Sequence, residues 1–163
     1  MTRPLILCVE DEPEVLEVLI RDLEPFAIAF HIEPVEDTAE AREVIQASAA
    51  AGEPLALVLC DHVLPREKGV DFLIALRGDD ATKAARLVLV TGQAGLDDTV
   101  RAVNRAGLDH YVAKPWNPEE LRAVVRDQLT EFVIDQSEDL LPFVPVLDGV
   151  RLMGEIQSRK SSE

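Results

Sequence analysis

Polar side chains that could take part in a reaction follow the apolar runs of this chain. In chain order they are Glu10, Asp11 and Glu12 after the first run, Asp61 after the third, Thr91 after the fourth and Lys114 after the fifth. Carboxylates crowded at one place repel each other and favour a divalent cation, and Mg²⁺ takes oxygen ligands in octahedral geometry. If the fold brings these run ends together, the residue types predict a magnesium site.

An aspartate held beside a metal can also act as a nucleophile on phosphorus. Asp61 attacking a phosphoryl group would give an acyl phosphate. Lys114 and the metal would neutralise charge on the transferring group. Thr91 could donate a hydrogen bond to a phosphoryl oxygen, and Gly92 leaves room for it. The set therefore fits phosphoryl transfer to Asp61.

The apolar runs and the stretches between them predict the elements that position these residues. Nearly uninterrupted apolar runs, typical of strands buried on both faces of a parallel sheet, are Pro4–Val9, Ile28–Ile32, Leu55–Cys60, Leu87–Val90 and His110–Val112. Amphipathic stretches that predict helices are Glu12–Leu23, Thr38–Ala50, Val70–Arg77, Leu96–Ala106 and Pro118–Phe132. Five β-then-α units predict an α/β, doubly wound sheet, and functional groups in such sheets lie at the carboxyl ends of strands.

Four motifs now point to a family. VEDEPEVL (9–16), LVLCDHVLPREKGVDFL (57–73), LVLVTGQ (87–93) and HYVAKPWNPEEL (110–121) occur in the order found in receiver domains of two-component response regulators. The chain resembles such a receiver over roughly residues 3–130. The resemblance implies a (βα)5 flavodoxin-like fold with five parallel strands in the order 2-1-3-4-5.

The resemblance also implies roles for the acidic residues. Asp61 would be the phosphoacceptor and, together with Asp11, a direct ligand of Mg²⁺. Glu10 would occupy the neighbouring acidic position, often bound through water, and the backbone carbonyl of Val63 would be a further ligand. Glu12 is expected to be a solvated loop residue.

Further roles fall on residues around the phosphoryl group. Thr91 and Lys114 would bind it, with the Lys114–Pro115 peptide cis. Tyr111 matches the aromatic switch residue, which changes rotamer as Thr91 moves. Val63 and Gln93, each two residues after a site residue, would tune the lifetime of the acyl phosphate by flanking the path of water. His62 is expected to point away from the site as a surface residue.

Charge and hydropathy limit the partners. The chain has 163 residues with 16 Lys+Arg against 31 Asp+Glu, so its net charge is 16 − 31 = −15, which argues against direct binding to nucleic acid or anionic lipid. The apolar runs are far shorter than the roughly 20 residues of a membrane span, and no signal-peptide pattern begins the chain. Cys8 and Cys60 lie within apolar runs, which indicates buried, reduced thiols. We expect a cytoplasmic protein.

The chain divides into a receiver domain at residues 1–130 and an apolar C-terminal extension at residues 131–163. Pro142 and Pro145 prevent one continuous helix, so we expect a lengthened last helix, a turn, and a short helix capped by Asp148 and ending near Gln157. Two interpretations remain open. The extension folds back on its own receiver, or its apolar face pairs with a second copy or docks a partner.

The sequence thus favours a phosphorylation-switched response regulator rather than an enzyme. A histidine kinase or phosphotransfer protein would donate the phosphoryl group, and output would be contact with a downstream protein or a homodimer formed through the last helices or the extension. One alternative is the receiver half of a larger output protein. A second is an aspartyl-phosphate hydrolase, but such enzymes use an acidic residue as general acid and base at the position that Val63 occupies here. A third is an interaction module that no longer needs phosphate.

Overall fold

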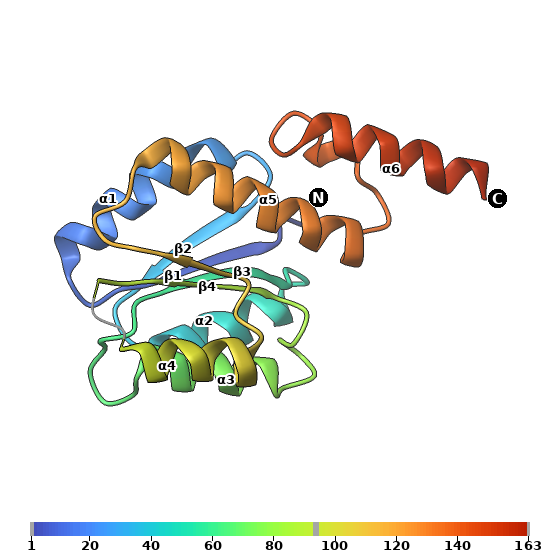
Figure 1. Ribbon diagram of the computed structural model, residues 1–163. Coiled ribbons are helices and arrows are strands. Elements are labelled where there is room, and N and C mark those ends of the chain that lie inside the picture. Colours follow the sequence, from blue (N-terminus) through green and yellow to red (C-terminus); the bar gives the residue numbers. More distant parts are fainter. Residues whose placement is uncertain (1, 93–94, 163) are drawn as a thin grey trace.

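A five-stranded parallel sheet forms the centre of the molecule, with helices on both faces (Figure 1). The structure, a computed structural model, describes residues 2–92 and 95–162. The strand order is β2-β1-β3-β4-β5, and every neighbouring pair is parallel. The strands are β1 (Leu5–Val9), β2 (His31–Val35), β3 (Leu55–Cys60), β4 (Arg86–Val90) and β5 (His110–Val112). This confirms the predicted fold class and strand order.

Six α-helices and three short helical segments connect and extend the strands of the described chain. The α-helices are α1 (Pro13–Leu23), α2 (Thr38–Ala50), α3 (Gly69–Arg77), α4 (Leu96–Arg101), α5 (Pro118–Gln136) and α6 (Gly149–Ser161). The 3-10 helices are Glu24–Phe26 and Leu141–Phe143, and a π-helix, Ala102–Ala106, directly continues α4. In Figure 1, α1 and α5 cover one face of the sheet, and α2, α3 and α4 cover the other.

Local sequence signals explain where several of the helices begin. The side chain of Asn117 accepts hydrogen bonds from the first backbone N–H groups of α5, and Asp148 accepts one from the N–H of Arg151 in α6. Such caps satisfy donors that have no partner within the helix. Pro13 opens α1, at a position where its missing N–H costs nothing. The predicted cap at Asp148 is confirmed, although α6 continues to Ser161, beyond the predicted end.

The second strand lies elsewhere than predicted. The sequence indicates Ile28–Ile32, whereas β2 is His31–Val35 and Ile28 is 80% exposed. The turn that follows the 3-10 helix Glu24–Phe26 takes up the first part of the predicted run. Because β2 is an edge strand, most of its residues are only half-buried, and it tolerates Pro34. A continuous apolar run therefore does not mark this strand.

The C-terminal extension packs against the receiver. Leu140, Phe143, Leu147 and Leu152 are buried in the same hydrophobic cluster as residues of β1, α1 and α5. The ring of Phe143 lies 5.3 Å from that of Phe30, centroid to centroid. The interpretation in which the extension folds back on its own receiver is thus what the structure shows.

Polar contacts fix both ends of α6. The backbone N–H of Asp148 donates to the hydroxyl of buried Thr130 at 3.3 Å. Near the end of α6, the guanidinium of Arg159 donates to the carbonyls of Ile134, Ser137 and Glu138 at 2.7–3.2 Å. These carbonyls lie at and just beyond the C-terminal turn of α5, where helix carbonyls lack internal partners. Within the described residues, no helix is long and apolar enough to span a membrane.

Candidate functional site at the carboxyl end of the sheet

The parallel register brings Glu10 and Asp61 side by side. Val9, the last residue of β1, pairs with Cys60, the last residue of β3. Glu10 and Asp61 are the next residues of the two strands, and the N–H of Asp61 donates to the carbonyl of Val9 at 3.0 Å. Adjacent strands that end in register therefore deliver two carboxylates to one edge, as the sequence predicted.

Four carboxylates gather at this edge. One oxygen from each of Glu10, Asp11, Glu12 and Asp61 lies within 4.8 Å of the others. Glu10 and Asp61 are buried, whereas Asp11 and Glu12 are exposed. Glu12 was expected in the solvent only; its carboxylate is exposed but also belongs to this group. Four oxygen donors of high charge density match the ligand preference of a hard divalent cation, so the residues present fit the Mg²⁺ that the sequence predicts.

Asp61 accepts hydrogen bonds from three sides. The ammonium group of Lys114 donates to its Oδ2 at 2.9 Å, and the N–H of Val63 donates to its Oδ1 at 3.4 Å. The side chain of Thr91 also hydrogen-bonds to it. Burial acts to raise the pKa of Asp61, but the hydrogen bonds from Thr91 and Lys114 outweigh burial and lower it. Asp61 is therefore ionised at neutral pH, as a nucleophile must be.

Lys114 bridges the two buried acids. Its ammonium group contacts both Glu10 and Asp61, and these contacts raise the pKa of Lys114 although burial acts to lower it. Burial raises the pKa of Glu10, and the charge of Asp61 adds to this rise, while Lys114 and the N–H of Glu12 oppose it. One cation thus stands among four carboxylates, which leaves the site with excess negative charge.

Tyr111 is connected to Thr91 through its hydroxyl group. The Tyr111 hydroxyl donates to the backbone carbonyl of Thr91 at 2.9 Å, and the tyrosine side chain is partly exposed at the edge strand β5. Thr91 itself is buried, and its N–H donates to the carbonyl of Val112 at 3.0 Å. The Lys114–Pro115 peptide is cis, which confirms that prediction. The structure therefore joins the proposed switch residue to Thr91 directly.

Three residues to which the sequence analysis gave an expectation remain. The side chain of Val63 is 52% exposed, so it can flank an approach to Asp61 without orienting water. Gln93 lies outside the described residues. His62 differs from its expected surface position: it is 5% exposed, and its Nε2 lies 3.0 Å from Oδ2 of Asp98 in α4. It is buried because α4 packs over the loop that follows β3.

Sequence reasoning missed Gly69, at the start of α3. Its N–H donates to the carbonyl of His62 at 2.9 Å, and an added Cβ would lie 1.9 Å from the carbonyl oxygen of Asp61. Only a residue without a side chain permits this approach. A glycine eight residues after a candidate nucleophile was the available signal, but composition alone does not reveal which backbone it must meet.

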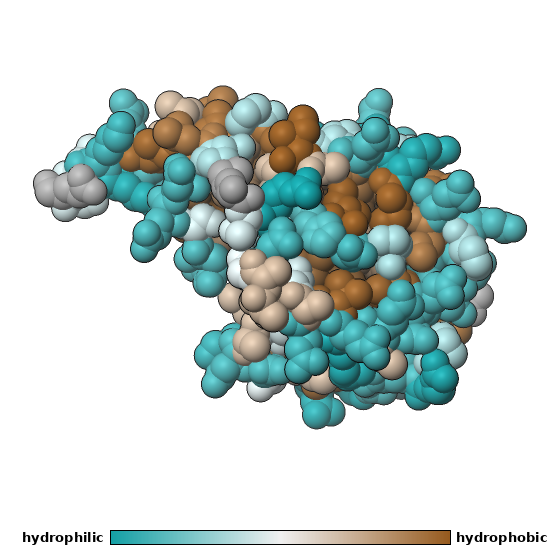
Figure 2. All heavy atoms as spheres, turned by 180° about the vertical axis from the view of Figure 1, so that it is seen from behind, coloured by the Kyte–Doolittle hydropathy of each residue, from teal (hydrophilic) through white to brown (hydrophobic). Residues whose placement is uncertain are grey.

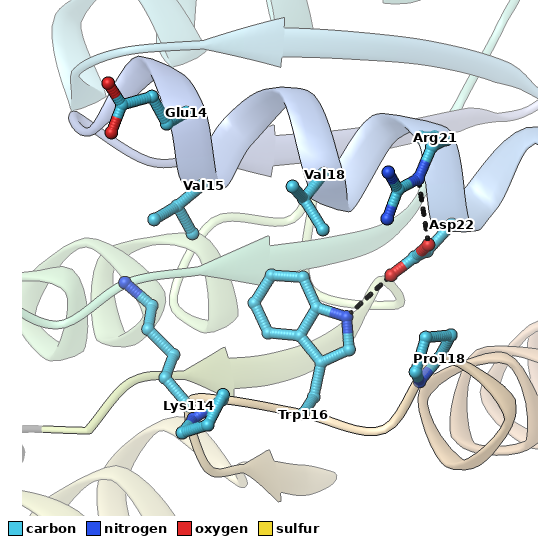
Figure 3. Close-up of a pocket in the computed structure, with 9 residues that line it drawn as sticks. Glu14, Val15, Val18, Arg21, Asp22, Lys114, Trp116 and Pro118 are labelled. Carbon is cyan, nitrogen blue, oxygen red and sulfur yellow. Dashed lines mark hydrogen bonds and ion pairs between the residues drawn. The ribbon is translucent and has the colours of Figure 1, made fainter.

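A pocket of about 570 Å³ opens beside the site, between α1 and the loop that leads from β5 to α5 (Figure 3). Val15 and Val18 of α1 face the indole of Trp116, and the Trp116 Nε1–H donates to buried Asp22 at 2.8 Å. Lys114 lies at one end of the lining. The pocket therefore shares a residue with the phosphoryl-binding candidates, which the sequence did not indicate.

Comparison with known proteins agrees with this geometry. The family model of the response regulator receiver domain matches residues 6–126. A solved receiver domain protein from Methanospirillum hungatei, described as CheY-like, superposes with a TM-score of 0.68 at 28% identity, covering 80% of this chain and 97% of that one. The receiver domain of an HD domain-containing protein from Pseudomonas fluorescens has a TM-score of 0.72 at 23% identity, covering 85% and 96%, and shows the shared fold.

Several relatives are transcriptional regulators. The phosphate regulon regulator PhoB of Escherichia coli is 32% identical over 122 residues, which are 74% of this chain and 49% of that protein. The hydrogenase regulator HoxA of Cupriavidus necator is 31% identical over 121 residues, 74% of this chain and 23% of that protein. The chain thus spans half or less of the length of these two relatives. The family match agrees with the fold and with the grouping of the candidate site residues at the carboxyl end of the sheet. The chain belongs to the receiver domain family of two-component response regulators.

Proposed function

We propose that this chain is a phosphorylation-switched response regulator in which Asp61 accepts a phosphoryl group from a histidine kinase or a phosphotransfer protein. The observation that carries the proposal is the convergence on Asp61 of Lys114 and Thr91 beside the four-carboxylate cluster. Each group has a task in phosphoryl transfer, and the parallel register of the strands holds them at one edge.

The residues of the chain supply the nucleophile and part of the charge stabilisation. A carboxylate oxygen of Asp61 forms the P–O bond as the P–N bond to the donor histidine breaks, and the imidazole of the donor keeps the bonding electron pair. The lowered pKa of Asp61 means that no general base is needed. Lys114 and Thr91 bind the phosphoryl oxygens in place of the carboxylate that they contact in the unmodified protein.

Asp11 and Asp61 would hold Mg²⁺ directly, together with the backbone carbonyl of Val63, and Glu10 would bind it through water. When bound, the ion offsets negative charge on the carboxylates and on the transferring group. The excess of carboxylates over the single cation Lys114 supports this assignment. Glu12 is close enough to contribute charge to the same group.

The donor must bring its phosphohistidine to the same edge. The pocket beside Lys114 supplies a place for it to pack, because Val15, Val18 and Trp116 form an apolar lining next to the reacting group (Figure 3). Glu14 and Arg21 add charged positions at its border, which can select among donors.

The output is contact with another protein. Binding of the phosphoryl group to Thr91 would draw Thr91 inward, and its backbone carbonyl is already connected to Tyr111. The shift of Tyr111 would change the surface formed by α4, β5 and α5. The exposed Val63 in place of an acid supports this signalling role over an aspartyl-phosphate hydrolase.

A homodimer through the extension is a further part of the proposal. Figure 2 shows hydrophobic residues gathered on the C-terminal extension, at the upper left. Within the extension, Val150 of α6 is 88% exposed and Met153 of α6 is 48% exposed. Light scattering on the full chain, before and after phosphorylation, is expected to show a dimer that Val150→Glu weakens. A monomer in all four samples would refute this part.

Intact-mass spectrometry after incubation with acetyl phosphate tests the central proposal. The wild-type chain is expected to gain the mass of one phosphoryl group with Mg²⁺ and to lose it slowly. Asp61→Asn and a sample with excess EDTA should stay unmodified. Equal labelling of Asp61→Asn, or an unmodified wild type, would contradict the proposal.

A further inference from the structure

The loop that carries Asp61 has a direct polar contact to α4. His62, the next residue in the chain, is buried, and its Nε2 lies 3.0 Å from Oδ2 of Asp98 in the first turn of α4. Among the described residues, the other ring nitrogen, Nδ1, is buried without a hydrogen-bond partner. Asp98 is therefore the one polar anchor that the structure gives this ring, which makes the contact sensitive to either residue.

Asp98 is also the centre of a larger set of contacts. The Lys68 ammonium group lies 4.0 Å from its Oδ2, and the guanidinium of Arg101 lies 3.2 Å from its Oδ1. Arg101 in turn pairs with Asp71 in α3 at 2.6 Å. These contacts come from the loop after β3, from α3 and from α4 itself. Asp98 therefore joins α4 to the segment that follows the phosphoacceptor.

The backbone around His62 cannot shift freely toward α3. The carbonyl of His62 accepts the N–H of Gly69 at 2.9 Å, and the Cβ position of Gly69 falls 2.9 Å from the Cα of His62. A displacement of the Asp61 backbone must therefore carry His62 with it. This movement would change the contact between His62 and Asp98. On the α4 side, the helix continues as the π-helix Ala102–Ala106. π-Helical turns are uncommon and often mark functional sites, so α4 has a segment in which a small shift can be absorbed.

We propose that the His62–Asp98 contact is a latch that couples modification of Asp61 to the position of α4, with His62 and Asp98 acting as positioning residues. This rests on the proposed function, in which Asp61 is the phosphoacceptor. The latch acts on the side of the loop after β3, apart from the connection through Thr91 and Tyr111. In the unmodified protein it holds the first turn of α4 against the loop. Modification of Asp61 changes how firmly that turn is held.

Hydrogen exchange of α4 tests the latch. Amides of residues 98–106 are compared in the full chain, unmodified and after treatment with beryllofluoride and Mg²⁺, for the wild type, Asp98→Ala and the neighbouring control Asp97→Ala. We expect the wild type and Asp97→Ala to show a clear change in exchange upon modification. In Asp98→Ala, exchange should be at least about tenfold faster in the unmodified protein, and the change upon modification should fall by more than half. A merely structural contact would alter stability without altering this response.

A double-mutant cycle completes the experiment. In His62→Ala/Asp98→Ala, the loss of the α4 response should be smaller than the sum of the two single losses, because both changes remove the His62–Asp98 contact. Asp98→Ala removes the contacts to Lys68 and Arg101 as well, so its effect on the unmodified protein should be the larger of the two. Additive effects, or an unchanged α4 response in Asp98→Ala, would overturn the latch. ¹⁹F NMR reports separately whether beryllofluoride binds. Binding with an unchanged α4 response refutes the latch alone, whereas a wild type that fails to bind refutes the proposed function and the latch with it.

Discussion

Truncation of one buried side chain in the C-terminal extension should destabilise the whole receiver. Phe143 is 6% exposed, and its ring packs in a tilted arrangement against that of Phe30, with the centroids 5.3 Å apart. Phe→Ala changes in protein cores cost about 3–5 kcal/mol, and since Phe143 lies at the edge of the core we expect about 3 kcal/mol. For a chain of this size, each kcal/mol lowers the melting temperature by roughly 2–4 °C. Phe143→Ala should therefore lower it by roughly 6–12 °C.

Leu141 provides a matched control within the same 3-10 helix. It is 61% exposed, and changes at exposed positions usually stay within about 0.5 kcal/mol. Leu141→Ala should shift the melting temperature by less than about 2 °C. Both variants are compared with the wild type by circular dichroism, through thermal and urea unfolding of the full chain. Equal stability of the two variants, or a separate early transition in Phe143→Ala with the main transition unchanged, would show that the extension is not part of the receiver core.

Three further predictions concern the site. Glu10→Gln should weaken Mg²⁺ binding roughly ten- to a hundredfold, as for other groups that support a metal through water, measured by calorimetry; unchanged affinity would remove Glu10 from the site. The carboxyl carbon of Asp61 should titrate below its ordinary pKa in Mg²⁺-free NMR spectra, and Thr91→Val should move this midpoint upward. Because the folded-state pKa of Asp61 is lowered, its stabilising contribution is present above the unfolded-state pKa and lost as pH falls through the folded one. Gly69→Ala should cost at least about 1–3 kcal/mol by overpacking and slow phosphorylation, whereas Gly78→Ala, whose Cβ has no neighbour closer than 3.6 Å, should leave both nearly unchanged.

Most of the fold could be predicted because its inner strands are buried on both faces. Each residue of β1 and β3 is buried, so an uninterrupted apolar run located these strands to within a residue. The edge strand β2 was placed too early because half of its environment is solvent and Ile28 is apolar yet exposed. Hydropathy reports burial, and an edge strand is only partly buried.

The site residues at the strand ends could also be predicted from the sequence, whereas contacts between loops and helices could not. Residues at the carboxyl ends of parallel strands must meet, so Asp61, Lys114 and Thr91 were predictable from the elements alone. The latch between His62 and Asp98 was not, because its two residues lie 36 positions apart and the contact depends on how α4 packs over a loop. Nor does periodicity reveal that Gly69 touches the backbone of Asp61. Contacts between loops and helices need the tertiary structure.

The identity of the phosphorylated residue tests the account most directly. The full chain is incubated with acetyl phosphate and Mg²⁺, reduced with borohydride, digested and sequenced by mass spectrometry, since borohydride converts an aspartyl phosphate to homoserine. The account predicts homoserine at position 61 alone, and none in a sample lacking the phosphoryl donor. Homoserine at another acidic residue, or none in a chain shown to be folded, would contradict it.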